Sequence, residues 1–353
     1  MAVMVQCEYS GEGLKKRPEA KRRRRAYFAR FNPYKPDGPS STLESSHGVS
    51  WERNRLLGKG GFGYVFLARR RKKRAGVLGR QENQEAGELP LFLAVKSATS
   101  VDSLSLVHEK RVFHDLQRGS CPYILKCYGR EVAELTSGDK IYNLLLEYCS
   151  GFNLEHWIID SGTGLPESHV KRYVRDIVKG LKYIHGRGYV HCDIKPSNIL
   201  LVPIKKRMPT GYLAKIGDFG LAMSIKEGEE GEKIEGMRGT PSYMSPELVR
   251  EKQIGYGADI WALGCSMVEM LSGKSAWYSA GGNQSVNGDA LLHIIGYTDY
   301  LPQLPSSASN DALDFMSKCL CRNPQERWSA EKLLGHPFLY REDPKRCNLI
   351  VLD

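Results

Sequence analysis

Two motifs in the first third of the chain have the residue types and spacing to hold a phosphate group. The first fits G-x-G-x-x-G-x-V and consists of Gly58, Lys59, Gly60, Gly61, Phe62, Gly63, Tyr64 and Val65. Glycines let a backbone approach phosphates without a Cβ clash, although an ordinary glycine turn remains an alternative. A dinucleotide-binding loop is disfavoured, because a predicted strand, 64–69, follows where that motif requires a helix.

The second motif is Leu93-Ala94-Val95-Lys96. A Lys at the end of an apolar strand costs free energy unless its ammonium group contacts an anion. Because Lys96 follows the glycine segment, the phosphates of a nucleotide are the favoured anion. A carboxylate should hold this ammonium, and Glu109 in the next predicted helix offers one. The alternatives are a Lys96 side chain that extends to water and a Glu109 that is a solvated helix charge.

A denser group of polar residues follows in the second half of the chain. His191-Cys192-Asp193-Ile194-Lys195-Pro196-Ser197-Asn198 precedes the apolar run Ile199-Leu200-Leu201, and Asp218-Phe219-Gly220 forms a further motif. A carboxylate, an ammonium and an amide fall within six consecutive residues, and apolar residues flank them. Packing of a hydrophobic core does not explain such a cluster. The spacing of Asp193, Lys195 and Asn198 therefore indicates chemistry.

The elements that must position these residues change from strands to helices along the chain. Short alternating or apolar segments predict strands at 53–57, 64–69, 90–97 and 141–149. Amphipathic periodicity predicts helices at Ser103–Leu116, from Pro166 onward, and at 258–271, 311–321 and Ala330–Leu334. Strands first and helices afterwards indicate an α+β fold with two lobes. We expect 1–50 to be a disordered basic extension and 340–353 a short tail.

Composition excludes several classes of protein. The 353 residues are 41% hydrophobic and 26% charged, without an apolar run long enough for a membrane span. The N-terminal apolar stretch is too short for a signal peptide. Nine cysteines without a C-x-x-C pair predict reduced intracellular thiols, not a disulfide framework or a zinc site.

The net charge of +11 is concentrated in two stretches. Residues 1–50 hold ten basic and five acidic side chains, and 69–90 hold seven basic and three acidic. The rest of the chain is nearly balanced, which disfavours a nucleic-acid-binding fold. The clusters 15–17 and 21–25 could instead bind an import receptor, with 69–74 as a rival segment for that role. The alternatives are a solvated tail and a docking arm for an acidic partner.

The four motifs, in this order, resemble those of the protein kinase family, and the resemblance covers 51–339. It implies a two-lobed kinase fold with an N-lobe at 51–147, a hinge at 147–151 and a C-lobe at 152–339. It also implies that Asp193 is the catalytic base, that Lys195 offsets charge on the moving phosphoryl group, and that Asn198 and Asp218 bind Mg²⁺.

The resemblance further implies an ATP site. Its expected residues are Leu57, Gly58, Lys59, Gly60, Gly61, Phe62, Gly63, Tyr64, Val65, Ala94, Lys96, Glu109, Leu146, Glu147, Cys149 and Leu200. Lys96 and Glu109 would form the ion pair that orients the phosphates. Leu146 and the residues to Cys149 would form the hinge whose backbone meets adenine.

The C-terminal half continues the resemblance. Gly239-Thr240-Pro241-Ser242-Tyr243-Met244-Ser245-Pro246-Glu247 is similar to the end of a kinase activation segment, with Ser245 where Ala is usual. Glu247 should pair with Arg327, and Thr240 should bond to Asp193 or Lys195. Cys192 replaces an Arg, and 225–239 contain no Ser, Thr or Tyr. We therefore expect activity without phosphorylation of this loop.

Finer features favour one branch of serine/threonine kinases. A-V-K-S at 94–97, H-C-D-I-K at 191–195 and L-P-Q-L-P at 301–305 resemble plant MAP kinase kinase kinases of the short, single-domain MEKK-like group. This implies a MAP kinase kinase as substrate, in stress or hormone signalling, and we expect a cytoplasmic and nuclear location. The alternatives are a pseudokinase-like scaffold, which the complete catalytic set disfavours, and a basic nucleic-acid-associated protein.

Overall fold

The computed structural model describes residues 48–60, 63–71, 89–99, 103–134, 140–204, 211–225, 231–278 and 288–340. These residues form two compact units, which divide at Phe152 and Asn153. Gly119–Ile124, which the expected N-lobe included, group with the second unit, because the N–H of Ile216 donates to the carbonyl of Tyr123 at 2.8 Å. The expectations for 1–50 and 340–353 lie almost wholly outside the described residues.

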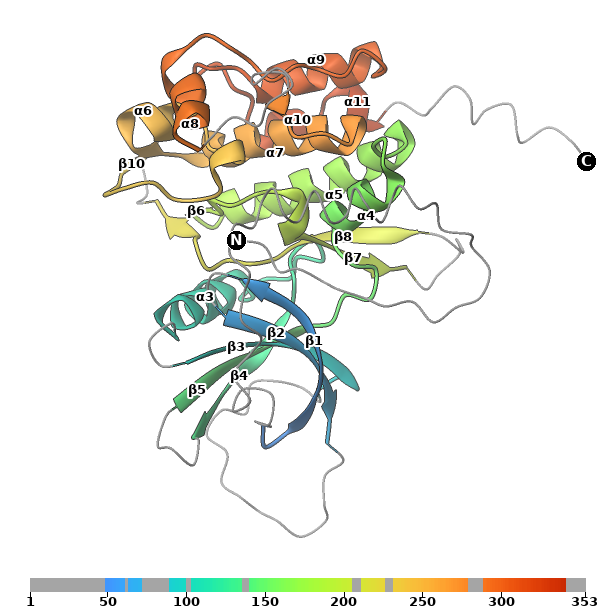
Figure 1. The fold of residues 1–353 in the computed structure, drawn as a ribbon, viewed down its shortest axis with the longest axis vertical. Helices are drawn as coiled ribbons and strands as arrows, with labels where there is room; N and C mark the ends of the chain where they lie inside the picture. The colour runs from blue at the N-terminus through green and yellow to red at the C-terminus, as the bar shows by residue number, and fades with distance from the viewer. Residues whose placement is uncertain are drawn as a thin grey trace, which may run out of the picture. The chain divides into compact units, whose positions relative to one another are not determined.

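The first unit is an antiparallel sheet with one helix, as Figure 1 shows. Its strands are β1 (Trp51–Gly60), β2 (Gly63–Arg70), β3 (Phe92–Thr99), β4 (Cys127–Glu134) and β5 (Lys140–Glu147), in the order β1-β2-β3-β5-β4. The helix α3 (Ser103–Leu116) has the predicted bounds and packs on β3, β4 and β5. β4 was not predicted, because this edge strand has only one buried residue and lacks an apolar pattern.

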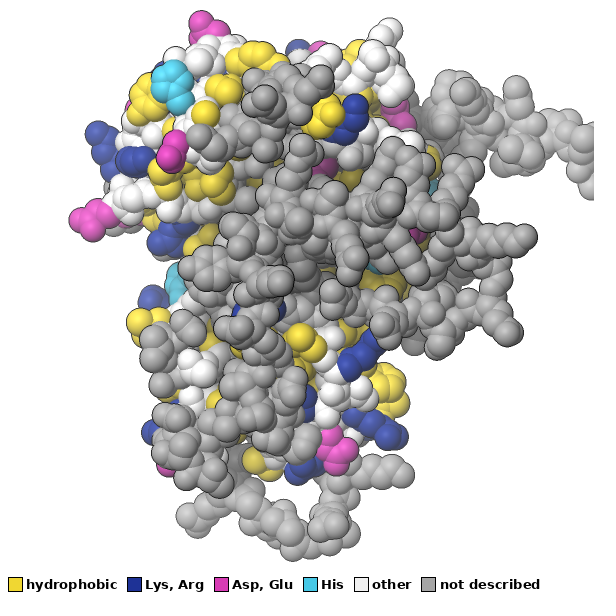
Figure 2. Space-filling view, in the orientation of Figure 1, with side chains coloured by type: hydrophobic (Ala, Val, Ile, Leu, Met, Phe, Trp, Pro, Cys, Tyr) yellow, Lys and Arg dark blue, Asp and Glu magenta, His cyan; other side chains and the backbone are white. Residues whose placement is uncertain are grey.

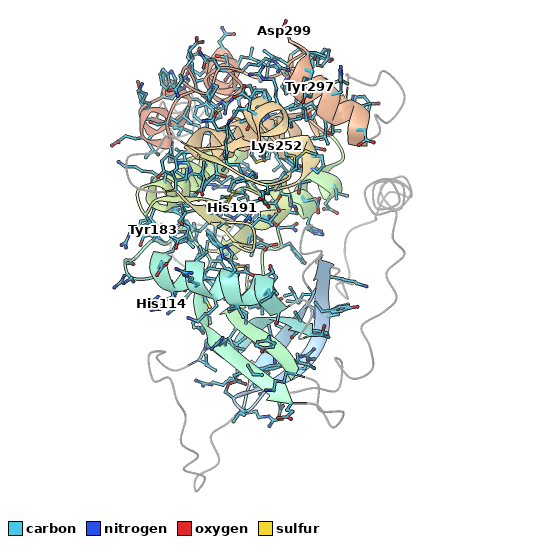
Figure 3. The ribbon with its side chains drawn as sticks, turned by 90° about the vertical axis from the view of Figure 1, so that its left-hand side faces the viewer. His114, Tyr183, His191, Lys252, Tyr297 and Asp299 are labelled. Carbon is cyan, nitrogen blue, oxygen red and sulfur yellow. The ribbon has the colours of Figure 1, made fainter. Side chains whose placement is uncertain are left out.

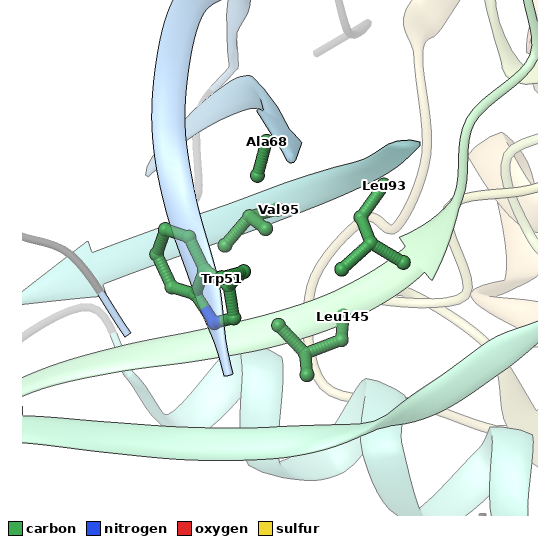
Figure 4. Packing of buried hydrophobic residues seen from close by; sticks show 5 residues of the cluster. All are labelled: Trp51, Ala68, Leu93, Val95 and Leu145. Carbon is green, nitrogen blue, oxygen red and sulfur yellow. The ribbon is translucent and has the colours of Figure 1, made fainter. Parts of the chain in front are cut away.

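Strand register separates two faces of this sheet. One face carries the packed cluster of Figure 4, formed by Trp51, Ala68, Leu93, Val95 and Leu145. Because successive strand side chains point to opposite faces, the intervening residues of β3, which include Lys96, belong to the other face. The cluster thus fixes the register that presents Lys96 on the second face.

Short strand pairs in the second unit frame the polar residues predicted to act. β6 (Tyr189–Val190) pairs with β9 (Met223–Ser224), β7 (Ile199–Pro203) with β8 (Tyr212–Ile216), and β10 (Glu232–Lys233) with β11 (Gln253–Ile254). Two 3₁₀ turns, η1 (Pro196–Asn198) and η2 (Pro241–Tyr243), complete the connections. The segment 191–198 therefore runs between β6 and β7, and Asp218 follows β8.

Helices make up most of the second unit, which confirms the predicted α+β class with strands first and helices afterwards. They are α4 (Leu154–Ser161), α5 (Glu167–His185), α6 (Pro246–Glu251), α7 (Tyr256–Ser272), α8 (Gly288–Tyr297), α9 (Asn310–Cys319), α10 (Ala330–Leu334) and α11 (Pro337–Tyr340). α7 is buried along most of its length and contacts α5 and α9, so it forms the centre of the unit. None of the described helices combines the length and apolarity needed to cross a bilayer.

Candidate active site

Lys96 and Glu109 form a buried ion pair in the first unit. The Nζ of Lys96, in β3, lies 2.7 Å from Oε2 of Glu109, in α3. The two residues are only 4% and 0% exposed. Lys96 therefore does not extend to water, and Glu109 is not a solvated helix charge. The predicted pair is confirmed. The predicted strand end is wrong, since β3 continues to Thr99 and places Lys96 inside the strand.

The glycine segment joins β1 to β2 as an antiparallel pair. Gly58 lies opposite Val65 and Gly60 opposite Gly63, while Gly61 and Phe62 lie outside the described residues. Gly63 has a φ of 126°, and a Cβ there would lie 2.2 Å from the carbonyl oxygen of Ser97. Only glycine fits this conformation and this approach of two backbones.

Apolar residues of the predicted nucleotide site lie on the same sheet face as Lys96. Cross-strand pairing places Val65 opposite Lys96 and Ala94 opposite Leu146, and these four residues are buried. Leu57, in β1, is also buried. The register thus brings an ammonium group and a set of apolar side chains to one surface of the sheet.

Residues predicted as the hinge follow the end of β5. The N–H of Glu147 donates to the carbonyl of Lys126 at 2.8 Å, and Oε2 of Glu147 accepts from the N–H of Lys126 at 3.1 Å. The thiol of Cys149 lies 4.0 Å from the carbonyl oxygen of Glu147. These contacts hold the last residue of β5 to the residue before β4, and the thiol of Cys149 to the end of β5.

Three side chains of the second unit meet around the carboxylate of Asp193. Its Oδ2 lies 2.7 Å from Nζ of Lys195 and accepts from Nδ2 of Asn198 at 2.9 Å. Its Oδ1 accepts from the hydroxyl of Thr240 at 2.7 Å, and that hydroxyl accepts from Lys195 at 2.6 Å. The predicted contacts of Thr240 are confirmed. The carboxylate is fixed in orientation by three donors.

The backbone before Asp193 is held by a buried carboxylate of α7. Asp259 accepts from the N–H groups of His191 and Cys192 at 2.8 and 2.9 Å, and its Oδ2 lies 2.9 Å from Nε2 of His185. This supports the left-handed backbone of Cys192, whose φ is 66°. The sequence predicted a helix at 258–271 but not this role of Asp259.

The imidazole of His191 lies inside the second unit, as Figure 3 shows, and positions the next residues. Its Nε2 lies 3.0 Å from the carbonyl oxygen of Gly217, and its Nδ1 accepts from the N–H of Asp193 at 3.2 Å. A carbonyl only accepts and an amide N–H only donates, so the proton belongs on Nε2. The ring also packs edge-on against Phe219, with centroids 4.9 Å apart. His191 therefore links the Asp193 loop to the Asp218 motif.

Asn198 and Asp218 have the donor chemistry of a Mg²⁺ site. Oδ1 of Asn198 is buried without a hydrogen-bond partner, while its Nδ2 is occupied by Asp193. Asp218 has a φ of 60°, and the N–H of the residue before it, Gly217, donates to the carbonyl of Asn198 at 3.0 Å. An unused amide oxygen and a carboxylate are hard oxygen donors, which fit Mg²⁺. Leu200, in β7, is half-buried and bridges to Asn153.

The segment that carries Thr240 is anchored to the helices by ionic and aromatic contacts. The guanidinium of Arg327 binds both carboxylate oxygens of Glu247, at 2.8 and 3.1 Å, which confirms the predicted pair. The indole N–H of Trp277 donates to the carbonyl of Ser242 at 2.9 Å, and the hydroxyl of Tyr243 donates to Glu269 at 2.5 Å. The sequence did not predict the last two contacts, since they join side chains from distant elements.

Two groups near the site have raised pKa values. Burial raises the pKa of Glu155, in the first turn of α4, to about 7, and the carboxylate of Glu269 acts in the same direction. Burial also raises the pKa of the Cys192 thiol well above its ordinary value, assisted by Asp259. No pattern in the sequence marked Glu155 as a perturbed carboxyl, because its partner Glu269 lies on another helix.

The comparisons with known proteins agree with this geometry. The model of the protein kinase domain matches residues 51–339. Mitogen-activated protein kinase kinase kinase 20 of Arabidopsis thaliana is 39% identical over 86% of this chain and 82% of its own length. Mitogen-activated protein kinase kinase kinases 17 and 18 of the same plant are each 35% identical, over 82% and 86% of this chain and 70% and 81% of their own lengths.

A five-stranded antiparallel sheet with a buried Lys–Glu pair, and a helical unit with an Asp-Lys-Asn loop, define a phosphotransferase. The chain belongs to the protein kinase family and is a serine/threonine protein kinase. Members of this family use ATP and Mg²⁺.

Proposed function

We propose that this kinase is a MAP kinase kinase kinase, which transfers the γ-phosphoryl group of ATP to a Ser or Thr hydroxyl of a MAP kinase kinase. The contacts of Asp193 with Lys195, Asn198 and Thr240 are the main observation that supports phosphoryl transfer. The names of the relatives and their coverage of the chain support the place in the cascade. A role in plant stress or hormone signalling completes the proposal.

Asp193 acts as the catalytic base in this proposal. Its carboxylate accepts the proton of the substrate hydroxyl as that oxygen attacks phosphorus. Phosphoryl transfer depends mainly on positioning, so a fixed carboxylate of ordinary basicity is sufficient. The bonds from Thr240 and Asn198 supply that fixation at the two oxygens of the side chain.

Two lysines supply positive charge to different parts of the nucleotide. Lys195, 2.7 Å from Asp193, offsets negative charge that develops on the transferred phosphoryl group. Lys96, oriented by Glu109, holds the other phosphates, and the glycine segment from Gly58 to Gly63 lets backbone groups approach them.

The remaining predicted residues would bind Mg²⁺ and adenine. Oδ1 of Asn198 and the carboxylate of Asp218 would hold the ion, which neutralises phosphate charge when bound. Leu57, Val65, Ala94 and Leu146, all in the first unit, would surround the base. Backbone groups between Glu147 and Cys149 would meet its polar edge.

The test is phosphorylation of a panel of purified MAP kinase kinases with Mg²⁺ and ATP. We expect transfer to at least one member, and loss of transfer in Asp193→Asn and in Lys96→Met. Both variants should keep the thermal unfolding midpoint of the wild type within a few degrees, since they act through charge and not through core packing. Wild-type turnover in either variant would exclude this mechanism, and a pseudokinase-like scaffold would show no transfer at all.

We also propose that the protein is distributed between nucleus and cytoplasm, because Lys and Arg cluster at 15–17 and 21–25. A fluorescent fusion of the full chain should enter the nucleus more than a fusion that lacks residues 1–30. Equal nuclear entry of the two fusions would contradict an import receptor that binds these clusters, and 69–74 would then be the next segment to delete.

A further inference from the structure

One face of α5 carries five cations and no acid. We name this face the basic stripe of α5, and it consists of Lys171, Arg172, Arg175, Lys179 and Lys182. At 3.6 residues per turn these positions fall within an arc of about 100°. The opposite arc is the buried apolar face of the helix, so the stripe is the side turned away from the core.

The two acids of α5 both have hydrogen-bond partners outside the stripe. Glu167 accepts from the N–H and the hydroxyl of Ser309, at 2.8 and 2.6 Å. Asp176 is 8% exposed, accepts from the N–H of Ala214 at 3.1 Å, and lies beside the stripe on its buried edge. Burial raises the pKa of Asp176 to about 6 in spite of the cations around it.

Three cations of the stripe form no ion pair with the part of the chain that the structure describes. Lys182 lies 3.0 Å from Glu331, and both side chains are exposed. Across the described ranges, Arg172, Arg175 and Lys179 form no ion pair within 4 Å. Lys179 instead donates to the hydroxyl of Tyr123 at 3.1 Å, and Nε of Arg172 is buried without a hydrogen-bond partner.

Like charges three and four residues apart on a helix repel one another. Lys171, Arg175 and Lys179 are spaced by four, so each faces a cation on the next turn. On the face shown in Figure 2, by contrast, Lys and Arg side chains are interspersed with Asp and Glu. An anionic partner that covers the stripe would convert this repulsion into attraction.

The spacing of the stripe fits an extended acidic peptide. Residues four apart on a helix are separated by about 6 Å along its axis. Side chains on one side of an extended chain repeat about every 6.6–6.8 Å. Acids at every second position of such a peptide would therefore match successive cations of the stripe. From Lys171 to Lys182 the stripe spans about 17 Å, the length of five extended residues.

Aromatic rings, not aliphatic chains, border the stripe. The guanidinium of Arg187 lies 5.2 Å from the ring centroid of Tyr183, which Figure 3 labels, and Lys179 lies 5.2 Å from that of Tyr123. Among the described residues of α5 and of Gly119–Ile124, no large hydrophobic side chain is exposed. A membrane surface would need such side chains for insertion, so a polar macromolecule fits better.

We propose that the basic stripe of α5 docks an acidic, extended segment of a protein partner, with Arg175 and Lys179 at its centre. The choice of a protein over a nucleic acid rests on the proposed function, because a kinase of kinases must bind proteins. Docking at this stripe would raise the affinity for the partner without a change in the chemical step.

The test measures binding, so it does not depend on the proposed reaction. The full chain is titrated into a fluorescein-labelled peptide with Glu at alternate positions, and into its counterpart with Gln in place of each Glu. We expect the Gln peptide to bind at least about tenfold more weakly, and the affinity of the Glu peptide to fall as salt rises.

Paired variants assign the binding to the stripe. Arg175→Gln/Lys179→Gln should lower the affinity for the Glu peptide by about tenfold or more. Arg175→Lys/Lys179→Arg keeps both charges and should bind the peptide with wild-type affinity. Arg111→Gln/Arg130→Gln removes two exposed cations of the first unit and serves as the matched control. Thermal unfolding of each variant checks that the fold is retained, and phosphorylation of a generic basic protein should be unchanged.

Several results would overturn the proposal. Equal binding of the Glu and Gln peptides would show that acid recognition is absent, and equal losses in the stripe and control variants would show that only net charge matters. An oligo-dT single strand or phosphatidylserine vesicles that bind more tightly than the peptide, and lose that binding in the stripe variant, would assign the stripe to another class of partner. None of these results depends on whether a MAP kinase kinase is phosphorylated.

Discussion

The hydroxyl of Thr240 donates a hydrogen bond to Oδ1 of Asp193 at 2.7 Å. The hydroxyl oxygen of Thr240 also accepts from Nζ of Lys195 at 2.6 Å, so one hydroxyl contacts both charged groups of the site. Thr240 precedes η2, 47 residues along the chain from Asp193. The order of this segment is therefore coupled directly to the orientation of the carboxylate.

Removal of the Thr240 hydroxyl should slow the reaction. Thr240→Val keeps the side-chain shape but deletes a bond to a charged group, and such bonds contribute about 1.5–3 kcal/mol. We expect kcat to fall by about 10- to 100-fold, with Thr240→Ser close to the wild type. Steady-state rates at saturating ATP decide the matter, and a Val variant with wild-type kcat would show that this bond does not orient Asp193.

A side chain at position 239 should not be tolerated, whereas a side chain at nearby position 236 should be. Both have positive φ, 108° and 82°, but a Cβ on Gly239 would lie 2.4 Å from the carbonyl oxygen of Cys192. A Cβ on Gly236 has nothing within 4 Å. Gly236→Ala thus incurs only the conformational cost of about 1–2 kcal/mol, while Gly239→Ala must also displace the backbone before Asp193.

The comparison of these two variants is made on kinase activity and on thermal unfolding. We expect Gly239→Ala to lose at least about tenfold in kcat, because Thr240 moves with its neighbour, and Gly236→Ala to stay within about twofold. Equal effects of the two substitutions would mean that positive φ alone, and not the contact with Cys192, sets the requirement for glycine.

Glu155 should make folding less favourable as pH rises. Its pKa is about 7 in the folded protein against an ordinary value of 4.5, so the folded state holds a proton that the unfolded state releases. This carboxyl therefore imposes no penalty below pH 4.5, a growing one between 4.5 and 7, and a constant one above. Glu155→Gln, which cannot ionise, should be more stable than the wild type at pH 8.

Urea unfolding at pH 5.5 and at pH 8 measures this difference. The advantage of Glu155→Gln should grow by on the order of 2 kcal/mol between the two values. Asp176, which also has a raised pKa, is present in both proteins and cancels from the comparison. A pH-independent difference between the proteins would show that Glu155 titrates normally.

Local patterns were sufficient for the parts of the structure whose residues lie close in sequence. α3 had the predicted bounds because its apolar residues repeat with a helical period, and that helix placed Glu109 near Lys96. The strand predicted at 90–97 ended two residues before β3 does, because its apolar run stops before Ser97. Ser97 is nevertheless buried, since its hydroxyl donates to Asn143 at 2.7 Å, and a polar pair between strands leaves no trace in hydropathy.

Long-range contacts explain what the sequence did not reveal about the site. Asp259 reaches the backbone of His191 from 68 residues away, and the spare oxygen of Asn198 becomes visible only when its amide nitrogen is seen to bind Asp193. Glu155 is perturbed by a carboxylate of α7. Each of these features depends on which helices pack together, so residue types and spacing alone do not specify it.

The activation segment is held by contacts that need no phosphate. Arg238 donates to the carbonyl of Leu221 at 3.1 Å, and Glu247 binds Arg327. Cys192 stands where many kinases have an Arg that binds a loop phosphate, and burial raises the pKa of its thiol, so it is no substitute for that cation. The sequence 225–239 has no Ser, Thr or Tyr, although 226–230 lie outside the described residues.

Activity should therefore be independent of phosphorylation in this segment. Ser224 and Ser242 remain the accessible hydroxyls nearest to it, while Ser245 is 1% exposed. Protein made in bacteria and treated with phosphatase should match untreated protein in rate, and Ser224→Ala and Ser242→Ala should do the same. Thr240 is unsuitable for this test, because its substitution removes the bond to Asp193. A loss of more than about tenfold in any of these samples, equal to about 1.4 kcal/mol in the barrier, would show that the segment is a phosphorylation switch.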